Sequence, residues 1–292
     1  MQGTVLRGIG GFYTVLAEDG QLCTLRAQRK IKRGGMKPKV GDRVEILPGT
    51  GEEDGWLQSI LPRKNELERP PVANIDRIVL VASAAAPQAD LMLMDQMLIA
   101  ARRKRIAPML VVSKCELEPG SAAAIARQYR GAGLEVRAVS AVTGEGIAAL
   151  REALAGSVHA LAGQSGAGKS SLINALYGLS LETGDLSEKI ERGKNTTRRC
   201  ELIALEGGGM VLDTPGFSLL DTELFDPVEL QESYPEFEKY AGECYFKPCY
   251  HAAEPRCRVL EAVAAGEIDA QRHARYAEIL VETRNRWRER YD

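Results

Sequence analysis

The sequence predicts a multidomain fold with a small β-barrel, an α/β domain and a helical metal-binding domain, in that order. Short alternating apolar runs separated by glycine turns fill the first part of the chain. In the middle, strand patterns alternate with helical patterns, and one strand leads into a phosphate-binding loop. Three cysteines and a histidine gather near the C-terminus, before a helical tail. We expect the domains to span residues 1–66, 67–225 and 226–292.

Five short strands are expected in the N-terminal domain: Thr4–Arg7, Phe12–Ala17, Leu22–Ala27, Arg43–Leu47 and Trp56–Ile60. Five short strands joined by glycine turns indicate an OB-fold barrel. Seven basic residues and no acidic one then follow one another over a short segment: Arg26, Arg29, Lys30, Lys32, Arg33, Lys37 and Lys39. OB-folds use such loops on RNA backbones, although a solvated basic loop would have the same composition.

A charged segment from Arg63 to Val72 predicts a linker to the central domain. Strand patterns follow at Arg77–Ala82, Met109–Val112 and Leu134–Val139, and a helical pattern spans Asp90–Lys104, where methionines are expected to fill the core. Strands and helices alternate as far as Asp213, which predicts a parallel sheet covered by helices.

The strand Val158–Ala162 leads into a complete G-x-x-x-x-G-K-S loop. The loop consists of Gly163, Gln164, Ser165, Gly166, Ala167, Gly168, Lys169 and Ser170, and a helical pattern begins at Ser171. Backbone N–H groups of such a loop converge on phosphates at a helix N-terminus. Lys169 can reach the β- and γ-phosphates, and Ser170 can ligate Mg²⁺. We expect residues 163–171 to bind a nucleoside di- or triphosphate.

Two further segments fit a phosphate-transfer site. Asp213-Thr214-Pro215-Gly216 ends an apolar strand, so Asp213 can hold Mg²⁺ and the N–H of Gly216 can approach the γ-phosphate. The loop Gly193–Arg198 carries Thr196 and Thr197, either of which can close over Mg²⁺ and the γ-phosphate as a switch. A polar surface loop has the same composition.

Base-reading elements lie ahead of the phosphate-binding loop. Ser113-Lys114-Cys115-Glu116 follows one strand, and Ser140-Ala141 follows the next. GTPases read guanine with N-K-x-D and S-A elements, which normally come after the D-x-x-G turn. The order found here is a circular permutation, which is tolerable because chain termini lie at the surface and often close together.

A cluster with metal-ligand spacing lies near the C-terminus, at Cys244, Cys249, His251 and Cys257. Three thiolates and an imidazole suit one structural, tetrahedral Zn²⁺. A disulfide is the alternative, but nothing in the sequence indicates an oxidising compartment. Helical segments are expected at Ala264–Ile268 and Ala270–Tyr291. Of the remaining histidines, we expect His159 to lie in the core and His273 to be solvated.

The permuted motif order, the Gly-Lys-x-Thr-Thr-Arg loop and the flanking domains resemble the ribosome small-subunit-dependent GTPase A family, which are bacterial ribosome-assembly GTPases. The resemblance covers essentially the whole chain. It implies GTP or GDP with Mg²⁺, one structural zinc ion, and the small ribosomal subunit with its rRNA as partner.

Two departures from the family pattern affect the expected chemistry. Ser113 and Glu116 replace the Asn and Asp of N-K-x-D, and the extra methylene of Glu116 is expected to weaken guanine discrimination. Asn195 stands where the family has a histidine, and Phe217 where many GTPases have glutamine. Neither can take a proton from water, so intrinsic hydrolysis is expected to be slow.

Three functions are compatible with these motifs. The first is a GTPase that binds the small subunit late in assembly and couples hydrolysis to maturation and release. The second is a nucleotide-controlled RNA-binding switch with negligible turnover. The third is an ATPase or small-molecule kinase, which would not need the base-reading elements. The N-terminus lacks a signal-peptide pattern, and the longest largely apolar stretch, 78–88, is shorter than the ~18 residues of a membrane span. We therefore expect a cytoplasmic monomer without membrane contact.

Overall fold

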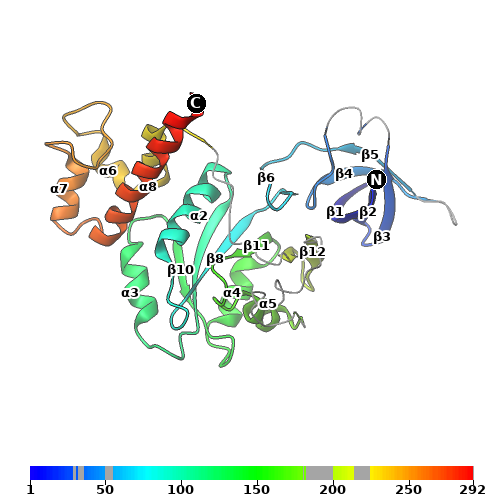
Figure 1. Ribbon diagram of the computed structural model, residues 1–292. Helices are drawn as coiled ribbons and strands as arrows, with labels where there is room; N and C mark the ends of the chain where they lie inside the picture. The colour runs from blue at the N-terminus through cyan, green and yellow to red at the C-terminus, as the bar shows by residue number, and fades with distance from the viewer. Residues whose placement is uncertain are drawn as a thin grey trace, which may run out of the picture.

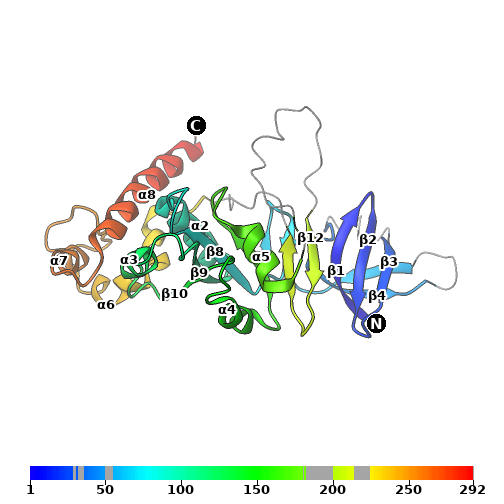
Figure 2. The same ribbon diagram turned by 90° about the horizontal axis from the view of Figure 1, so that it is seen from below.

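The computed structural model describes residues 1–28, 31, 36–49, 55–179, 181, 200–213 and 224–291. Its three parts follow one another in space as they do in the sequence (Figure 1). The β-barrel and the C-terminal helical part lie at opposite ends of the central α/β part, and the view from below shows the same arrangement (Figure 2). The central part therefore lies between the two flanking parts.

The N-terminal part is a closed five-stranded barrel, as predicted. Its strands are β1 (Gln2–Ile9), β2 (Phe12–Ala17), β3 (Leu22–Ala27), β4 (Arg43–Leu47) and β5 (Gly55–Ile60), in the order β1-β2-β3-β5-β4 with β4 closing onto β1. Along each strand, apolar and polar residues alternate, so that Val15, Leu25 and Leu57 are fully buried in the barrel interior. The barrel is OB-like in its strand number and closure.

The connection from the barrel to the central part is ordered by buried polar contacts. Arg63 lies 2.7 Å from the carboxylate of Asp42, which is completely buried under the barrel. The hydrogen bond to Asp42 raises the pKa of Arg63. A hairpin of β6 (Glu66–Leu67) and β7 (Val72–Ala73) follows. The segment expected as a linker is therefore tied to both of its neighbours.

The central sheet has the strand order β10-β9-β8-β11-β13-β12. Five strands are parallel: β8 (Arg77–Ser83), β9 (Ala107–Ser113), β10 (Glu135–Ala138), β11 (Val158–Ala162) and β13 (Met210–Asp213). The edge strand β12 (Glu201–Ala204) is antiparallel to β13.

The alternation of strands and helices expected as far as Asp213 is wrong at this edge, because β12 turns directly into β13. Gly207, Gly208 and Gly209 all have positive φ there. Glycine alone adopts such backbone angles freely, so this short turn forms a hairpin in place of a helical crossover.

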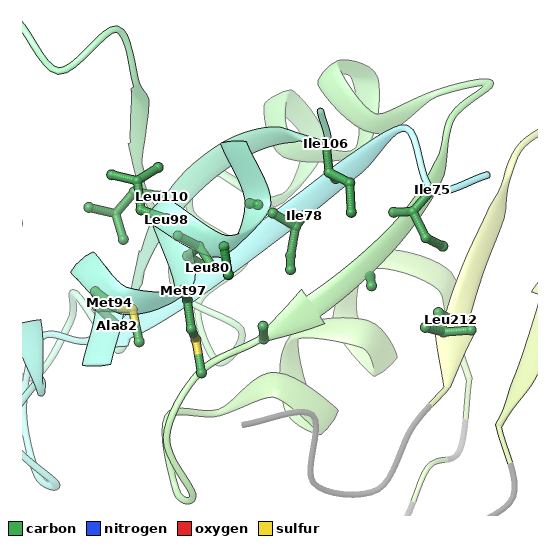
Figure 3. Packing of buried hydrophobic residues seen from close by; sticks show 14 of the residues in the cluster. Ile75, Ile78, Leu80, Ala82, Met94, Met97, Leu98, Ile106, Leu110 and Leu212 are labelled. Carbon is green, nitrogen blue, oxygen red and sulfur yellow. The ribbon is translucent and has the colours of Figure 1, made fainter. Parts of the chain in front are cut away.

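Helices cover both faces of the sheet. The helices α2 (Leu91–Arg103) and α3 (Ser121–Gln128) pack on one face, and α4 (Ile147–Leu154) and α5 (Lys169–Tyr177) on the other. Met94 and Met97 of α2 belong to the same buried cluster as Ile78 and Leu80 of β8 (Figure 3), which confirms that these methionines fill the core. The next residues along β8 point to the opposite face, as expected for a strand buried on both sides.

The C-terminal part consists of short helices around a compact loop. Its elements are η1 (Pro227–Ser233), η2 (Pro235–Phe237), α6 (Glu238–Ala241), α7 (Arg258–Ala264), α8 (Ala270–Arg288) and η3 (Glu289–Tyr291). The helix expected at Ala264–Ile268 is wrong, because α7 ends at Ala264 and Gly266 turns the chain with φ +74°. Asp269 then caps α8. No helix among the described residues is long and apolar enough to cross a membrane.

A buried ion-pair network attaches the C-terminal part to the central part. Arg272 of α8 is 2% exposed and lies 2.5 Å from both Asp95 of α2 and Glu236 of η2. Arg275 donates to the other oxygen of Asp95 at 2.6 Å. Burial lowers the pKa of Arg272, but the charges of Asp95 and Glu236 outweigh this effect and raise it overall. These charges hold α8 against α2.

Candidate nucleotide and metal sites

The predicted nucleotide-binding residues meet at one edge of the central sheet. Because β8, β9, β10 and β11 are parallel neighbours, their carboxyl ends lie together. The phosphate-binding loop follows β11, and the two base-reading segments follow β9 and β10. Parallel α/β sheets bind ligands outside these strand ends.

The phosphate-binding loop requires glycine for steric reasons. A Cβ on Gly163 would lie 2.3 Å from the carbonyl oxygen of Val81, so the loop starts in direct contact with β8. Gly168 has φ +87° and stands at the N-cap of α5. The backbone thus turns sharply into a helix N-terminus, the arrangement that binds phosphate.

Lys169 begins α5 and points back over the loop. Its ammonium group donates to the carbonyls of Gly163 at 2.8 Å and Gln164 at 2.7 Å. Burial lowers the pKa of Lys169, because a charged ammonium is less well solvated there. Ser170 and Ser171 follow in the first turn of the helix, both partly buried. Phosphate oxygens in the loop would supply the anionic partner that this lysine lacks among the described contacts.

A side chain of the loop fixes the segment after β8. The amide of Gln164 accepts from the backbone N–H of Asp90 at 2.7 Å and donates to the carbonyl of Gln88 at 2.7 Å. Asp90 is also the N-cap of α2. The loop is therefore connected to the start of α2. Ser165 and Gly166 of the same loop are exposed, whereas Ala167 is buried.

Ser113 joins the first base-reading segment to the phosphate-binding loop. Its buried hydroxyl donates to the carbonyl of Ala167 at 2.6 Å, with the carbonyl of Ala82 3.2 Å away. Lys114 has φ +60°, and its ammonium group donates to the carbonyl of Ala86 at 2.7 Å. The strand end and the loop thus form one connected unit.

Glu116 is the carboxylate that the sequence predicts to read the base in this segment. Its Oε2 atom is buried and has no hydrogen-bond partner within the described parts of the chain. A carboxylate oxygen in that state fits the N–H donors of a guanine base. Cys115 lies between Lys114 and Glu116, and its thiol donates to the carbonyl of Val112 at 3.0 Å. Burial raises the pKa of this thiol.

The second base-reading segment is a tight turn after β10. Ser140 is fully buried, and its hydroxyl accepts from the backbone N–H of Thr143 at 3.0 Å. The N–H of Ser140 donates to the carbonyl of Glu145 at 2.9 Å. These hydrogen bonds hold Ala141 near Ser113, at the edge of the sheet formed by the carboxyl ends of β9 and β10.

Asp213 ends β13, two strands from β8 in the sheet. Burial, and secondarily the charge of Glu201, raise the pKa of Asp213. A divalent cation beside this carboxylate would reverse that effect, so the residue fits a Mg²⁺ site.

Several residues named from the sequence lie outside the described parts. They are the loop Gly193–Arg198 with the expected switch residues Asn195, Thr196 and Thr197, the turn residues Thr214, Pro215, Gly216 and Phe217, and the basic residues Arg29, Lys30, Lys32 and Arg33.

The Cys/His residues form one compact cluster in the C-terminal part. Ligand atoms of Cys244, Cys249, His251 and Cys257 all lie within 4.8 Å of one another. The sulfurs of Cys244 and Cys257 are 3.8 Å apart, and His251 Nδ1 lies 3.4 Å from Cys257 Sγ. Zn–S bonds of ~2.3 Å in a tetrahedron would place sulfurs about 3.8 Å apart. The cysteines are free, and the geometry is compatible with one zinc ion.

The surroundings of the cluster also fit a metal. Burial raises the pKa of Cys249 to about 12, so thiolates here require a cation to be stable. His251 presents Nδ1 to the sulfurs while Nε2 lies 2.8 Å from the amide oxygen of Gln231. Metal-bound histidines commonly donate the second N–H in this way.

The expectation that His273 is solvated is wrong. His273 is 8% exposed, and its Nε2 lies 2.8 Å from the carbonyl of His251. The helical periodicity places it on the inner face of α8, which the charged composition of that helix had obscured. His159, by contrast, is fully buried as predicted.

Some supporting residues had no usable signal in the sequence. Gln231 lies twenty residues before His251, and nothing in its neighbourhood marks it as a partner. Asp95 was detectable in principle, because it is a carboxylate on the apolar face of a helix. Its partner Arg272 is distant in sequence and could come only from the tertiary structure.

Fold and site together define a circularly permuted P-loop nucleotide-binding protein with an OB-like barrel before it and a Cys/His cluster after it. A family model described as RsgA GTPase matches residues 60–223, and one described as RsgA N-terminal domain matches residues 2–57. The chain belongs to the RsgA GTPase family, which confirms the resemblance seen in the motifs.

Its relatives are similar over nearly the full length. A protein of Geobacillus thermodenitrificans named small ribosomal subunit biogenesis GTPase RsgA is 43% identical over 293 residues, covering 98% of each chain. The crystal structure of YjeQ from Thermotoga maritima has a TM-score of 0.83 at 34% identity, covering 97% of this chain and 98% of that one. YloQ, described as a circularly permuted GTPase, has a TM-score of 0.81 at 32% identity, covering 98% and 95%. The predicted permutation is confirmed.

Proposed function

We propose that this protein hydrolyses GTP on the small ribosomal subunit during late assembly, and that hydrolysis is coupled to subunit maturation and release. One observation carries the proposal. At the carboxyl edge of the sheet, a hydrogen bond from Ser113 to Ala167 connects the predicted base-reading segment to the phosphate-binding loop. Relatives 40–43% identical over nearly their whole length bear the name of small ribosomal subunit biogenesis GTPases. Such a role places the protein in the cytoplasm, with the subunit and its rRNA as partner.

The residues of the site take separate roles in this proposal. GTP and Mg²⁺ supply the phosphate chemistry when bound. Lys169 neutralises the phosphates, while Ser170 and Asp213 hold Mg²⁺, together with a threonine of the switch loop. Glu116 accepts from guanine, and Ser140 and Ala141 shape the base pocket. Asn195 and Phe217 offer no base for the attacking water, so the subunit provides the acceleration.

We further propose that the Cys/His cluster holds one structural zinc ion. The four protein ligands complete a tetrahedral shell, so no position remains for a substrate. The ion would hold the loop between α6 and α7 against α8, where Cys249 and Cys257 belong to the same core as Tyr276.

Hydrolysis of GTP and ATP, measured with and without purified small subunits, tests the function. We expect slow turnover of GTP alone, faster turnover with subunits, and tighter subunit binding with a non-hydrolysable GTP analogue than with GDP. If subunits neither prefer the triphosphate form nor change the rate, the ribosomal role is wrong. A GTP-dependent binder without turnover would instead be the switch considered from the sequence, which the relatives' naming as GTPases does not favour.

A further inference from the structure

The first strand of the barrel lies against the edge strand of the central sheet, so that β1 and β12 are neighbours (Figure 2). A β-bulge between Val5 and Arg7 shapes this contact. Val5 faces the barrel interior, whereas Leu6 is buried in the cluster that also holds Leu202 of β12. Regular alternation would return Arg7 to the barrel interior. The bulge instead leaves Arg7 on the outside, because such irregularities re-aim side chains.

Arg7 pairs with Glu201, the first residue of β12. One nitrogen of its guanidinium lies 3.7 Å from the Glu201 carboxylate, and the two side chains are 42% and 44% exposed. An ion pair this exposed contributes little to holding the barrel in place, and the burial of Leu6 contributes more. The main consequence of the pair is therefore the charge that it leaves at Glu201.

Glu201 stands directly opposite Asp213 in the antiparallel pair of β12 and β13. Opposite residues of two paired strands point to the same face of the sheet. The next pair on that face, Ile203 with Val211, packs in the cluster that includes α5. Since Ser170 lies in the first turn of α5, both carboxylates point to the face on which Ser170 is expected to hold Mg²⁺.

The two carboxylates interact across the strands. Burial and, second to it, the charge of Glu201 raise the pKa of Asp213. Two carboxylates attract a divalent cation more strongly than one, and a guanidinium beside them reduces that attraction. Three charges of alternating sign thus lead from the barrel to the expected Mg²⁺ position, on Arg7, Glu201 and Asp213.

We propose that Glu201 and Arg7 set the affinity of the nucleotide site for Mg²⁺. Glu201 strengthens cation binding at Asp213, and Arg7 weakens it by partly neutralising Glu201. Each residue acts through its charge and not as a ligand, so the barrel influences the nucleotide site without touching the nucleotide. The proposal rests on the function proposed above, because that function supplies GTP and Mg²⁺.

The Mg²⁺ dependence of nucleotide binding tests the proposal. The probe is a fluorescent, non-hydrolysable GTP analogue on the full-length protein, and the readout is the Mg²⁺ concentration that half-saturates its binding. Glu201→Gln should raise that concentration about threefold to tenfold, and Arg7→Gln should lower it about threefold, because the two changes remove opposite charges. Raising the ionic strength from about 0.05 M to about 0.5 M should shrink both effects.

Two further variants show whether charge is responsible. Arg7→Lys keeps the charge and should behave as the parent does. Arg43→Gln is the matched control, because Arg43 lies 3.9 Å from Glu18 in an exposed ion pair within the barrel. It should leave the Mg²⁺ requirement unchanged. The proposal is wrong if Arg7→Gln and Glu201→Gln shift the requirement in the same direction, as lost packing would, or by no more than Arg43→Gln does.

The measurement uses no ribosomal subunits, so this proposal and the ribosomal one fail separately. Opposite Mg²⁺ shifts in a protein whose hydrolysis subunits leave unchanged would support this proposal and refute the ribosomal role. Subunit-stimulated hydrolysis with one Mg²⁺ requirement for all variants would do the reverse. A parent protein that binds the analogue equally well without Mg²⁺ would overturn this proposal together with the role of Asp213.

Discussion

The hydroxyl of Tyr177 lies 2.7 Å from Nε2 of His159 and joins the two elements on either side of the phosphate-binding loop. His159 belongs to β11, which leads into the loop, and Tyr177 ends α5, which leaves it. The other ring nitrogen lies 3.2 Å from the carbonyl of Ser157. Both contacts suit a neutral imidazole with its proton on Nδ1.

This buried histidine should make stability depend on pH. Burial lowers the pKa of His159 from 6.5 to about 4, so the folded protein keeps it neutral while an unfolded chain protonates it below pH 6.5. The stability that the folded protein gains from a neutral His159 is therefore fully present above pH 6.5 and is lost as the pH falls toward 4. At pH 5 the loss is of the order of 2 kcal/mol.

Urea unfolding of the wild type and His159→Gln at pH 7.5 and 5.0 measures this loss. The free energy of unfolding of the wild type should fall relative to that of the variant at the lower pH. Tyr177→Phe is the control, because it keeps the titrating ring and should keep the pH dependence. Equal pH dependence of the wild type and His159→Gln would contradict the assignment.

Lys169→Ala should weaken GTP binding roughly 10–100-fold and abolish hydrolysis, because a charge-assisted contact to phosphate is lost. Ser170→Ala should chiefly remove the dependence of turnover on Mg²⁺. Isothermal calorimetry at fixed Mg²⁺ gives the affinities, and phosphate release gives the rates. Mg²⁺-stimulated turnover in Lys169→Ala would refute this role.

Ser113→Ala should weaken GTP binding about 5–10-fold, because the hydroxyl no longer satisfies the carbonyl of Ala167. Ser113→Asn should restore much of the affinity. Ser83 is the neighbour of Ser113 in register and is 2% exposed, and its hydroxyl has no partner within the described residues. Ser83→Ala should therefore bind GTP normally, and a loss equal to that of Ser113→Ala would show that general packing is responsible.

Arg272→Met should destabilise the protein by about 3–5 kcal/mol, because Asp95 and Glu236 would remain buried without their cation. Lys239 also pairs with a carboxylate, that of Glu267, but at the exposed surface. Lys239→Met should leave the unfolding transition unchanged. Thermal unfolding followed by circular dichroism compares the two, and similar transitions would argue against a structural role of the buried network.

One zinc ion per chain should copurify, as measured by inductively coupled plasma mass spectrometry. Cys249→Ser should lose the metal and loosen the C-terminal part, while GTP affinity stays largely intact because the nucleotide edge lies in another part of the chain. A second variant tests the partner of the histidine ligand. Gln231→Ala should retain zinc but release it to a chelator faster, because Nε2 of His251 loses its hydrogen-bond acceptor. Absence of zinc in the purified wild type would end this assignment.

Local pattern was sufficient for much of the fold. The five barrel strands, the α2 helix and the strand before the phosphate-binding loop follow from apolar periodicity and glycine turns, which depend on nearby residues alone. The pattern failed where a short segment could take two forms. Leu205–Gly209 became a hairpin turn, and Ala264–Ile268 became the gap between two helices, because glycine backbone angles decided both.

The sequence by itself determined which chemistry is present, because the phosphate-binding loop, the D-x-x-G turn and the Cys/His spacing each carry their reactive groups within a few residues. Only the tertiary structure decided which distant groups meet. It brought Ser113 to Ala167, Gln231 to His251 and Arg272 to Asp95. It also placed Arg7 of the barrel beside Glu201, opposite Asp213. Such contacts depend on strand order, register and helix packing, and these are set by the burial of the whole core rather than by any single segment.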